Sequence, residues 1–245
     1  MHTLFVSDVH LAPERPDITG QFLEFVGPVA AQAAALYILG DLFDYWIGDD
    51  AAGQSLDCAV AEALKRLAAG GVPVFYMHGN RDLLIGESFA RRCEARIIAD
   101  PARIDLYGTP TLLLHGDTLC TDDLEYQQFR AYVRNPANQA KFLAQPVEQR
   151  IQKMQGWMDA SRRRKGAKTD EIMDVSATAV EQVLRDHRYP RIIHGHTHRP
   201  AQHVHEVDGH RCERWVLNDW YACGGYLRCD ADGAITVHHA PWKKD

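Results

Sequence analysis

The first hundred residues alternate between short apolar runs and amphipathic helical patterns. The apolar runs are rich in β-branched and aromatic residues, and each ends in polar residues, as buried strands do where they enter a loop. They span residues 3–8, 35–41 and 72–80. Between them, residues 18–29 and 55–69 carry apolar side chains at helical spacing, with Ser55 as the expected N-cap and Gly70 closing the second helix. This alternation predicts a layered α/β fold.

The pattern changes beyond residue 100. A hairpin is expected around Gly108-Thr109-Pro110, and Asp-Gly pairs at 208–209 and 232–233 predict two further hairpins. From 122 to about 188 the signal is helical, and Asp122 with Glu125 resembles a capping box. We therefore expect a single domain over 1–245, in which a helical cap or lid is inserted at about 122–188.

Composition excludes several classes of protein. The apolar fraction of 46% and the charged fraction of 24% are those of a globular protein, and the net charge of -6 argues against broad binding to nucleic acid. The six cysteines include no C-x-x-C pair, which favours reduced thiols in a cytosolic protein. Because the sequence shows neither a signal peptide nor a run of about 20 apolar residues, we expect a soluble intracellular protein that can still touch a membrane surface.

Polar residues follow the apolar runs at five places. The motifs are "SDVH" with Asp8 and His10, "GDLFD" with Asp41 and Asp44, "GNRD" with Asn80, Arg81 and Asp82, "HGD" with His115 and Asp117, and "GHTH" with His196 and His198. In layered α/β folds the loops beyond the strand ends form the ligand crevice. We therefore expect these side chains to converge at one edge of the sheet.

The residue types at these strand ends suit two divalent cations. They offer carboxylate, amide oxygen and imidazole donors without cysteine, which favours Mn, Fe, Mg or Zn over a structural thiolate zinc site. Two cations about 3.5–4 Å apart need a bridging carboxylate and can then present a water for attack on phosphorus. Asp41 is the natural bridge, since it is the single acid at the end of the central strand.

Each motif taken alone has a simpler interpretation. Asp8 could cap a helix, Asn80 could occupy a left-handed turn position, and Arg81 could merely pair with Asp82 on the surface. A strand-end histidine is often only structural. The occurrence of all five motifs, each after a strand signal, is what favours a functional site.

The ordered series D-x-H, G-D-x-x-D, G-N-R-D, H-G-D and G-H-T-H resembles the calcineurin-like metallophosphoesterase superfamily. The resemblance implies a sandwich of two sheets flanked by helices. It also implies two sets of metal ligands that share Asp41. One set is Asp8, His10, Asp41 and His198, and the other is Asp41, Asn80, His115 and His196. His194 matches no ligand position, so we expect it to support the ligands from behind.

The predicted insertion carries two apolar stripes that could line an acyl-chain groove or could simply be core. The first stripe contains Tyr126, Phe129, Tyr132 and Val133, and the second contains Val147, Ile151, Met154, Trp157 and Met158. Next to them, "ASRRRKGAKTDE" is strongly basic and suits an anionic headgroup or diphosphate, although a basic run can equally be a solvated loop.

Over almost its whole length the chain is similar to the UDP-2,3-diacylglucosamine hydrolases of bacterial lipid A biosynthesis. The similarity rests on "SDVHL", "ILGDLFDYWIGDD", "HGNRD", "LLHGDTLCTDD", "IMDV" and "IHGHTHRP". It implies water attack on the α-phosphorus of the substrate, two Mn²⁺ ions per chain, and catalytic roles for Arg81, Asn80 and His196. It further implies a monomer bound peripherally to the cytoplasmic face of the inner membrane. The implied substrate contacts are Asn80, Arg81, Asp123, Ser161, Lys165, Lys168 and His196.

Two other functions remain open from the sequence. A soluble nucleotide pyrophosphatase or diadenosine tetraphosphate hydrolase would use the same metal site and would not need the insertion at 122–188. A non-catalytic metal-bound scaffold is the third alternative, and the complete ligand set argues against it, because a scaffold would be free to lose ligands such as Asn80 or His115.

Overall fold

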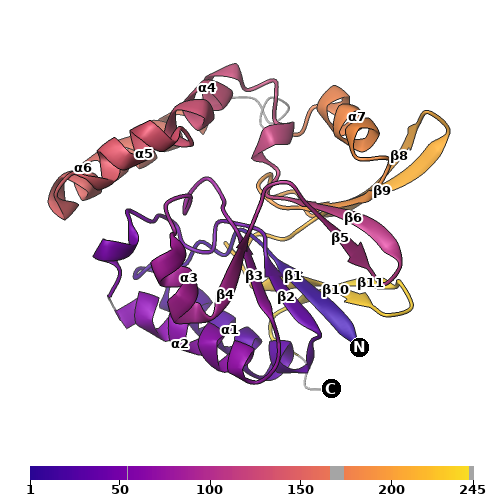
Figure 1. Ribbon diagram of the computed structural model, residues 1–245, viewed down its shortest axis with the longest axis horizontal. Helices are drawn as coiled ribbons and strands as arrows, with labels where there is room; N and C mark the ends of the chain where they lie inside the picture. Colours follow the sequence, from indigo (N-terminus) through magenta and orange to yellow (C-terminus); the bar gives the residue numbers. More distant parts are fainter. Residues whose placement is uncertain (54, 166–173, 243–245) are drawn as a thin grey trace.

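The computed structural model describes residues 1–53, 55–165 and 174–242, and within them two β-sheets face each other (Figure 1). The first sheet consists of β1 (His2–Val6), β2 (Ala35–Ile38), β3 (Val74–Met77), β4 (Ala95–Ile98), β10 (Gly225–Asp230) and β11 (Ile235–His239). The second sheet consists of β5 (Ala102–Leu106), β6 (Thr109–Leu114), β7 (Arg191–His194), β8 (Ala201–Val207) and β9 (His210–Val216). The layered α/β fold expected from the sequence is confirmed.

Both sheets combine a run of parallel strands with antiparallel strands at the edges, except that the edge strand β4 of the first sheet is parallel. The first runs in the order β11-β10-β1-β2-β3-β4, with β1 to β4 parallel to one another and β10 and β11 antiparallel to their neighbours. The second runs β5-β6-β7-β9-β8, with β6, β7 and β9 parallel. Because parallel strands end on the same side of a sheet, each sheet presents a row of loops at one edge.

Helices cover the outer face of the first sheet. These are α1 (Pro16–Glu24), continued by a π-helical turn η1 (Phe25–Val29), then α2 (Ser55–Ala69) and α3 (Glu87–Cys93). Phe22 and Leu64 from the helices are buried in one core with Leu36, Ile38 and Val74 from the strands. The helices predicted at 18–29 and 55–69 are therefore confirmed, and their apolar stripes explain why they pack here.

The ends of α2 differ slightly from the prediction. The helix begins at Ser55, so Ser55 is its first residue and not its N-cap. At the other end we expected Gly70 to close the helix, and it is the next residue, Gly71, that takes the left-handed conformation, with a φ of 95°. The N–H of Gly71 donates to the Ala68 carbonyl at 2.9 Å, and that of Val72 to the Leu67 carbonyl at 3.3 Å. This pair of hydrogen bonds ends the helix, and it requires a left-handed backbone at Gly71, one position after Gly70.

Two further cores hold the second sheet. Between the sheets, Phe5, Leu39 and Met77 pack in one cluster with Leu113 and Ile193. On the outer face of the second sheet, α7 (Ala177–Asp186) buries Val180 and Leu184 in a cluster with Leu112 and Ile192. Although α7 lies within the segment 122–188 that the sequence assigned to the insertion, it is packed as a covering layer of the sheet.

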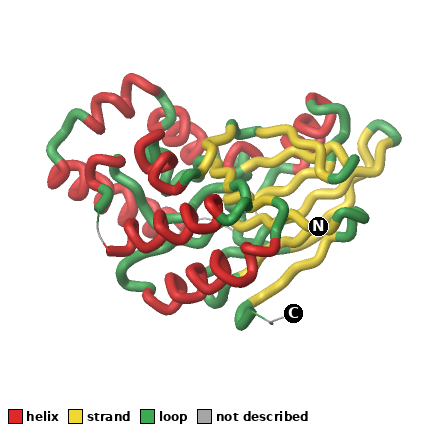
Figure 2. Tube along the Cα trace, turned by 60° about the horizontal axis from the view of Figure 1, so that its bottom comes forward, coloured by secondary structure: helices red, strands yellow, loops and turns green. Residues whose placement is uncertain are grey.

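The remaining helices stand apart from the sheets, beyond their strand ends (Figures 1 and 2). They are α4 (Leu124–Val133), α5 (Pro136–Leu143) and α6 (Val147–Lys165). Helix α4 is capped by Asp123, whose Oδ1 accepts from the N–H of Tyr126 at 3.0 Å, so the capping role predicted for Asp122 was wrong by one residue. No helix among the described residues is long and apolar enough to cross a membrane.

All three predicted hairpins are present, and β10 and β11 pair antiparallel around Asp232 and Gly233. Asp208 and Gly209 connect β8 and β9 with φ values of 52° and 81°, the left-handed pair of a type I′ turn. The hairpin of β5 and β6 turns at Tyr107 and Gly108, one residue earlier than expected. Thr109 and Pro110 instead belong to β6.

Candidate metal centre

The candidate ligands lie where the parallel strands of both sheets end. Five of them adopt a left-handed backbone although none is glycine. Their φ values are 54° at Asp8, 52° at His10, 54° at Asp41, 69° at His196 and 56° at His198. This conformation is costly for such residues and persists only where the surroundings impose it, which is typical of functional sites.

Glycines in the motifs let these loops approach one another. A Cβ atom at Gly79 would lie 2.0 Å from Oδ1 of Asp41, and one at Gly195 would lie 2.1 Å from Oγ of Ser7 and 2.2 Å from Oδ2 of Asp8. These distances are far below van der Waals contact. Gly79 is therefore needed for close approach of the loops after β2 and β3 within the first sheet, and Gly195 for close approach of the loops after β1 and β7 from the two sheets.

A first cluster consists of Asp8, His10 and His198, whose donor atoms lie within 4.8 Å of one another. Nε2 of His198 is 3.3 Å from Oδ1 of Asp8, and 3.4 Å from Nε2 of His10. Asp8 and His10 are buried, while His198 is partly exposed. The arrangement leaves one carboxylate oxygen and two imidazole nitrogens converging on a single point.

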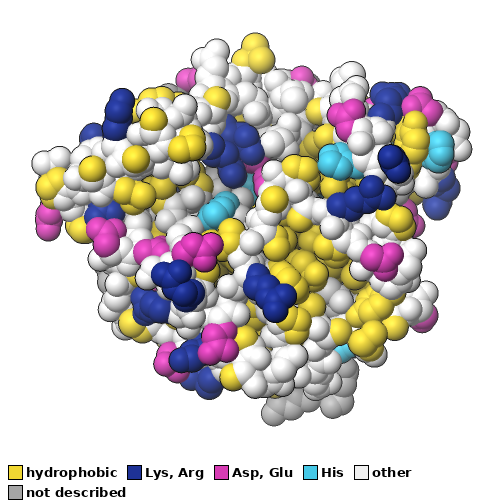
Figure 3. Space-filling model, in the orientation of Figure 1, with side chains coloured by type: hydrophobic (Ala, Val, Ile, Leu, Met, Phe, Trp, Pro, Cys, Tyr) yellow, Lys and Arg dark blue, Asp and Glu magenta, His cyan; other side chains and the backbone are white. Residues whose placement is uncertain are grey.

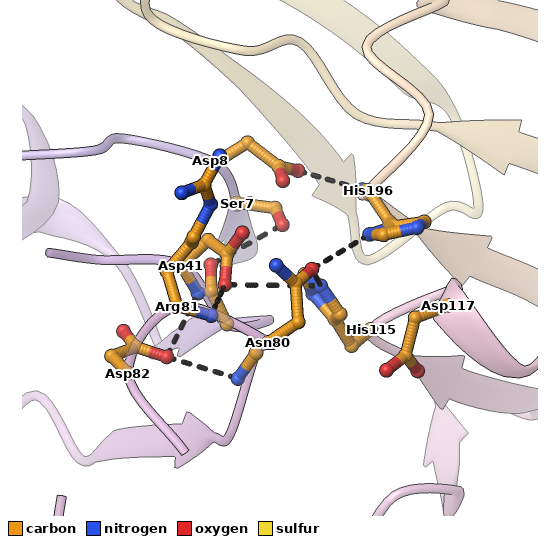
Figure 4. Close-up of polar contacts among 12 residues, drawn as sticks. Ser7, Asp8, Asp41, Asn80, Arg81, Asp82, His115, Asp117 and His196 are labelled. Carbon is orange, nitrogen blue, oxygen red and sulfur yellow. Dashed lines mark hydrogen bonds and ion pairs between the residues drawn. The ribbon is translucent and has the colours of Figure 1, made fainter. Parts of the chain in front are cut away.

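A second cluster surrounds Asn80 (Figure 4). Oδ1 of Asn80 lies 3.0 Å from Nε2 of His115 and 2.9 Å from Nδ1 of His196. Nδ1 of His115 donates to the carbonyl of Leu39 at 2.9 Å, which leaves Nε2 directed toward the site. A metal-binding histidine is commonly oriented in this way.

Asp41 lies between the two clusters. Its Oδ2 is 3.8 Å from Nε2 of His10, and its Oδ1 is 3.9 Å from Nε2 of His115. One oxygen therefore faces each cluster, as the bridging role expected of Asp41 requires. The structure brings all seven candidate ligands into one site.

The electrostatics of the site suit divalent cations. Burial raises the pKa of Asp41 to about 7, and the carboxylates of Asp82 and Asp8 contribute. Burial alone would lower the pKa of His115, but Asp41, Asp117 and Asp8 outweigh it and raise the pKa to about 9. Oδ1 of Asp8 is buried and accepts no hydrogen bond from the described residues. Such crowded buried carboxylates are stabilised by bound cations, so these residues fit a pair of them.

Asp82 has a role that the sequence did not indicate. Its side chain is fully buried and accepts from the backbone N–H groups of Gly79 at 3.0 Å, Asp41 at 3.2 Å and Leu42 at 2.7 Å. It therefore holds the loop after β3 against the loop after β2. The simpler interpretation, a surface pair of Asp82 with Arg81, is wrong because Asp82 is not at the surface.

His194 uses both ring nitrogens in hydrogen bonds away from the two clusters. Nδ1 donates to the Gly195 carbonyl at 2.8 Å, and Nε2 accepts from the guanidinium of Arg214 at 3.0 Å. Burial and the nearby Arg214 lower the pKa of His194 to about 3, so the ring is neutral. These contacts agree with the supporting position expected for His194.

A cavity of about 530 Å³ extends from the clusters to the three outlying helices. Its polar end includes Asn80, Arg81, His196 and two of the expected substrate contacts, Asp123 and Ser161. Residues of both stripes form its apolar walls, namely Tyr126, Phe129, Tyr132, Val133, Met154, Trp157 and Met158, and Phe142 of α5 adds to them. Lys168 and the side chain of Lys165 lie outside the described residues.

Polar contacts fix helix α4 to the loops of the site. The buried carboxylate of Asp117 accepts from the hydroxyl of Tyr126 at 3.0 Å and from Nε of Arg130 at 2.7 Å. Arg134 donates to the Gly79 carbonyl at 3.1 Å, directly before Asn80. These residues lie on one side of α4.

Helix α6 is fixed in a similar way. The side chain of Arg150 is 1% exposed, donates to the Ile47 carbonyl at 2.6 Å and forms an ion pair with Asp50. Helices α4 and α6 are thus joined to the body by arginine side chains, of which Arg150 is buried and Arg130 and Arg134 are partly exposed.

The sequence analysis also missed Tyr221, which lies beyond the end of β9. Its ring stacks on His10 with a centroid separation of 5.0 Å and an interplanar angle of 20°. Burial raises the pKa of its hydroxyl to about 12, so it is protonated at neutral pH. The same rule that located the ligands, a polar segment after a parallel strand, would have located Tyr221 had β9 been placed beside β7.

Comparison with known proteins agrees with this site. Residues 1–200 match the calcineurin-like phosphoesterase family. A UDP-2,3-diacylglucosamine hydrolase of Aromatoleum aromaticum is 54% identical over 233 residues, which cover 95% of each chain. Proteins of the same name from Stenotrophomonas maltophilia and Xanthomonas axonopodis pv. citri are each 52% identical. The match to the Stenotrophomonas protein covers 95% of this chain and 96% of that protein. The match to the Xanthomonas protein covers 96% of this chain and 97% of that protein.

Proposed function

Since the chain belongs to the calcineurin-like phosphoesterases, and within them to the UDP-2,3-diacylglucosamine hydrolases, we propose that it hydrolyses the pyrophosphate bond of UDP-2,3-diacylglucosamine. The products would be UMP and 2,3-diacylglucosamine 1-phosphate, the intermediate of lipid A biosynthesis. Water would attack the α-phosphorus, so that the new oxygen appears in UMP.

The observation that carries this proposal is the cavity that joins the metal centre to the apolar faces of α4, α5 and α6. Phe129 and Phe142 pack around Trp157, with ring centroids 5.7 and 5.4 Å from it, and form an aromatic wall. Ligand pockets typically occupy about 300–1,000 Å³ and combine apolar walls with a few polar groups. A substrate that is apolar at one end and carries a diphosphate at the other matches this arrangement.

We assign the metal positions to the ligand sets expected from the sequence. Asp8, His10, Asp41 and His198 would hold one Mn²⁺, and Asp41 with Asn80, His115 and His196 would hold the second. Two bound cations supply charge neutralisation of the diphosphate and activate a water for attack on phosphorus. The oxygen donors suit a hard cation such as Mn²⁺, and the imidazole donors complete its ligand sets.

The chain's own residues would orient the diphosphate. The backbone N–H of Arg81 donates to Oδ1 of Asp41 at 2.8 Å, which fixes Arg81 directly beside the ligands. From this position its guanidinium can bind a phosphoryl oxygen and stabilise the charge that develops there. Burial lowers the pKa of His196 to about 3, so its ring is neutral and has a lone pair for a cation.

We further propose that α4, α5 and α6 form a lid on a single domain. Asp123 and Ser161 would contact the sugar and its substituents from the lid side of the cavity. Lys165 and Lys168, whose side chains lie outside the described residues, would be further substrate contacts, as the sequence resemblance implies. The apolar walls would bind the acyl chains, at about 0.8 kcal/mol for each CH₂ group buried.

The lid also offers a surface for a membrane. Leu124, Tyr132 and Leu143 are 70%, 56% and 39% exposed, and hydrophobic side chains are spread over the outer surface of these helices (Figure 3). We propose that this surface docks on the cytoplasmic face of the inner membrane, where it would receive the lipid substrate. We further propose that the protein acts as a monomer.

Hydrolysis in ¹⁸O-labelled water tests the direction of attack. UDP-2,3-diacylglucosamine in detergent micelles is incubated with the Mn²⁺-loaded chain, and both products are analysed by mass spectrometry. The proposal expects the label in UMP. Label in the sugar phosphate would instead place the attack on the β-phosphorus.

A further inference from the structure

The segment after β9 is fastened to the loop that carries Asp8 and His10. The N–H of Trp220 donates to the Asp8 carbonyl at 3.0 Å. The guanidinium of Arg15 donates to the carbonyl of His10 at 3.0 Å and also to that of Tyr221 at 3.4 Å. These bonds fix the backbone of Tyr221 relative to the first metal-ligand cluster.

Trp220 and Tyr221 point in different directions from this segment. Trp220 is fully buried and packs against Phe22 and Phe25 under the first sheet. Tyr221 is 50% exposed, although its ring stacks on His10 and lies 5.3 Å from the ring of His198. The guanidinium of Arg15 also lies over the Tyr221 ring, 5.0 Å from its centroid. The exposed part of this ring is thus held rigidly against two candidate ligands.

The apolar cavity does not reach this surface. Among the described residues, its walls come from the clusters, from neighbouring loops that carry Trp46, Leu83 and Leu84, and from α4 to α6, and include neither Tyr221 nor Arg15. The metal centre therefore has two differently built sides. The lid side suits the acylated sugar, and the side of Tyr221 is left for the other half of a diphosphate substrate.

We propose that the exposed face of Tyr221 binds the pyrimidine base of the nucleotide half of the substrate by stacking. The base of a nucleoside monophosphate lies one ribose away from its phosphorus, and Tyr221 contacts the ligands that would hold the first cation. Stacking of a base on an aromatic side chain contributes substantially to affinity and needs no hydrogen bonds to specific atoms. This assignment rests on the proposed function, because it takes the nucleotide from the proposed substrate.

Titration calorimetry with two ligands tests the stacking directly. The Mn²⁺-loaded full chain is titrated with UMP and with ribose 5-phosphate, which has the same phosphate and sugar but no base. We expect UMP to bind roughly tenfold more tightly than ribose 5-phosphate, within the range that base stacking supplies. Tyr221→Leu should abolish this preference, and Tyr221→Phe, which keeps the ring, should retain it.

Two controls keep the result interpretable. Bound metal is measured in each variant, since Tyr221 packs on His10. In the wild-type chain loaded with Mg²⁺, nuclear Overhauser contacts between a tyrosine ring and the uracil protons provide a measurement that needs no substitution. Equal binding of the two ligands by the wild-type chain, or a preference that survives in Tyr221→Leu, overturns the proposal. If the chain binds UMP through Tyr221 but does not cleave the lipid substrate, the stacking site is supported and the proposed function is wrong.

Discussion

Nε of Arg130 in helix α4 lies 2.7 Å from Oδ2 of Asp117, which follows the candidate ligand His115 by two residues. Helix α4 has no buried side chain, so polar contacts fix its position where an ordinary surface helix would use an apolar face. Asp117 is fully buried, and its pKa is held low, against the effect of burial, by His115, His196, Arg134 and Arg130. The pair therefore couples the lid to the metal loops.

Replacing Arg130 should misplace the lid without removing the metals. For Arg130→Met we expect KM for UDP-2,3-diacylglucosamine to rise roughly tenfold, equivalent to about 1.4 kcal/mol. Cleavage of a small phosphodiester such as bis(4-nitrophenyl) phosphate, which does not use the cavity, should change less than twofold. Arg130→Lys keeps the charge and should be intermediate.

Gln128 provides the matched control on the same helix, because it is exposed. Gln128→Ala should leave both activities unchanged. A parallel fall of both activities in Arg130→Met would show that Arg130 supports the fold as a whole and does not position the lid.

The three histidines of "HGHTH" should differ in their effect on metal content. His196→Ala and His198→Ala each remove a candidate ligand and should lower the bound Mn²⁺ measured by plasma mass spectrometry to about one ion per chain or less. His194→Ala removes a neutral ring that contacts Gly195 and Arg214. His194→Ala should therefore retain more bound Mn²⁺ than His196→Ala or His198→Ala. Equal loss in all three variants would contradict the ligand assignment.

Gly195 should not tolerate even one methyl group. The Cβ atom of Gly195→Ala would lie 2.2 Å from Oδ2 of Asp8, so the loop after β7 must move away from the first cluster. We expect metal binding and activity to be lost. Gly20→Ala in α1 is the control, since a Cβ there meets nothing within 4 Å. Gly20→Ala should raise the free energy of unfolding by about 0.5–1 kcal/mol. Unchanged metal binding in Gly195→Ala would refute the close-approach argument.

The ligands were predictable because each follows a strand that the apolar pattern reveals. Asp8, Asp41 and Asn80 stand at the ends of parallel strands, and parallel strand ends share one edge. The roles of Asp82 and Asp117 were not predictable in the same way. Both are buried acids whose partners are backbone groups or arginines from distant segments, and only the packed structure brings those partners together.

The helical region shows the same limit. Its amphipathic stripes predicted helices, but periodicity alone does not identify the surface against which a helix packs. Helix α7 buries Val180 and Leu184 on the second sheet, whereas the stripe of α4 with Phe129 and Val133 lines a cavity. Capping was misassigned at Asp122 because either of two neighbouring acids could serve as the N-cap, and the helix begins at Leu124, directly after Asp123.

The central claim is that the metal centre and the lid cavity act on one lipid-linked nucleotide. Its most direct test is UMP release from UDP-2,3-diacylglucosamine in detergent micelles, with added Mn²⁺ or with EDTA, alongside diadenosine tetraphosphate as the competing substrate. We predict release of UMP that requires the metal, with no turnover of the dinucleotide. Turnover of the dinucleotide alone would retain the metal centre and contradict the assignment of the cavity to a lipid.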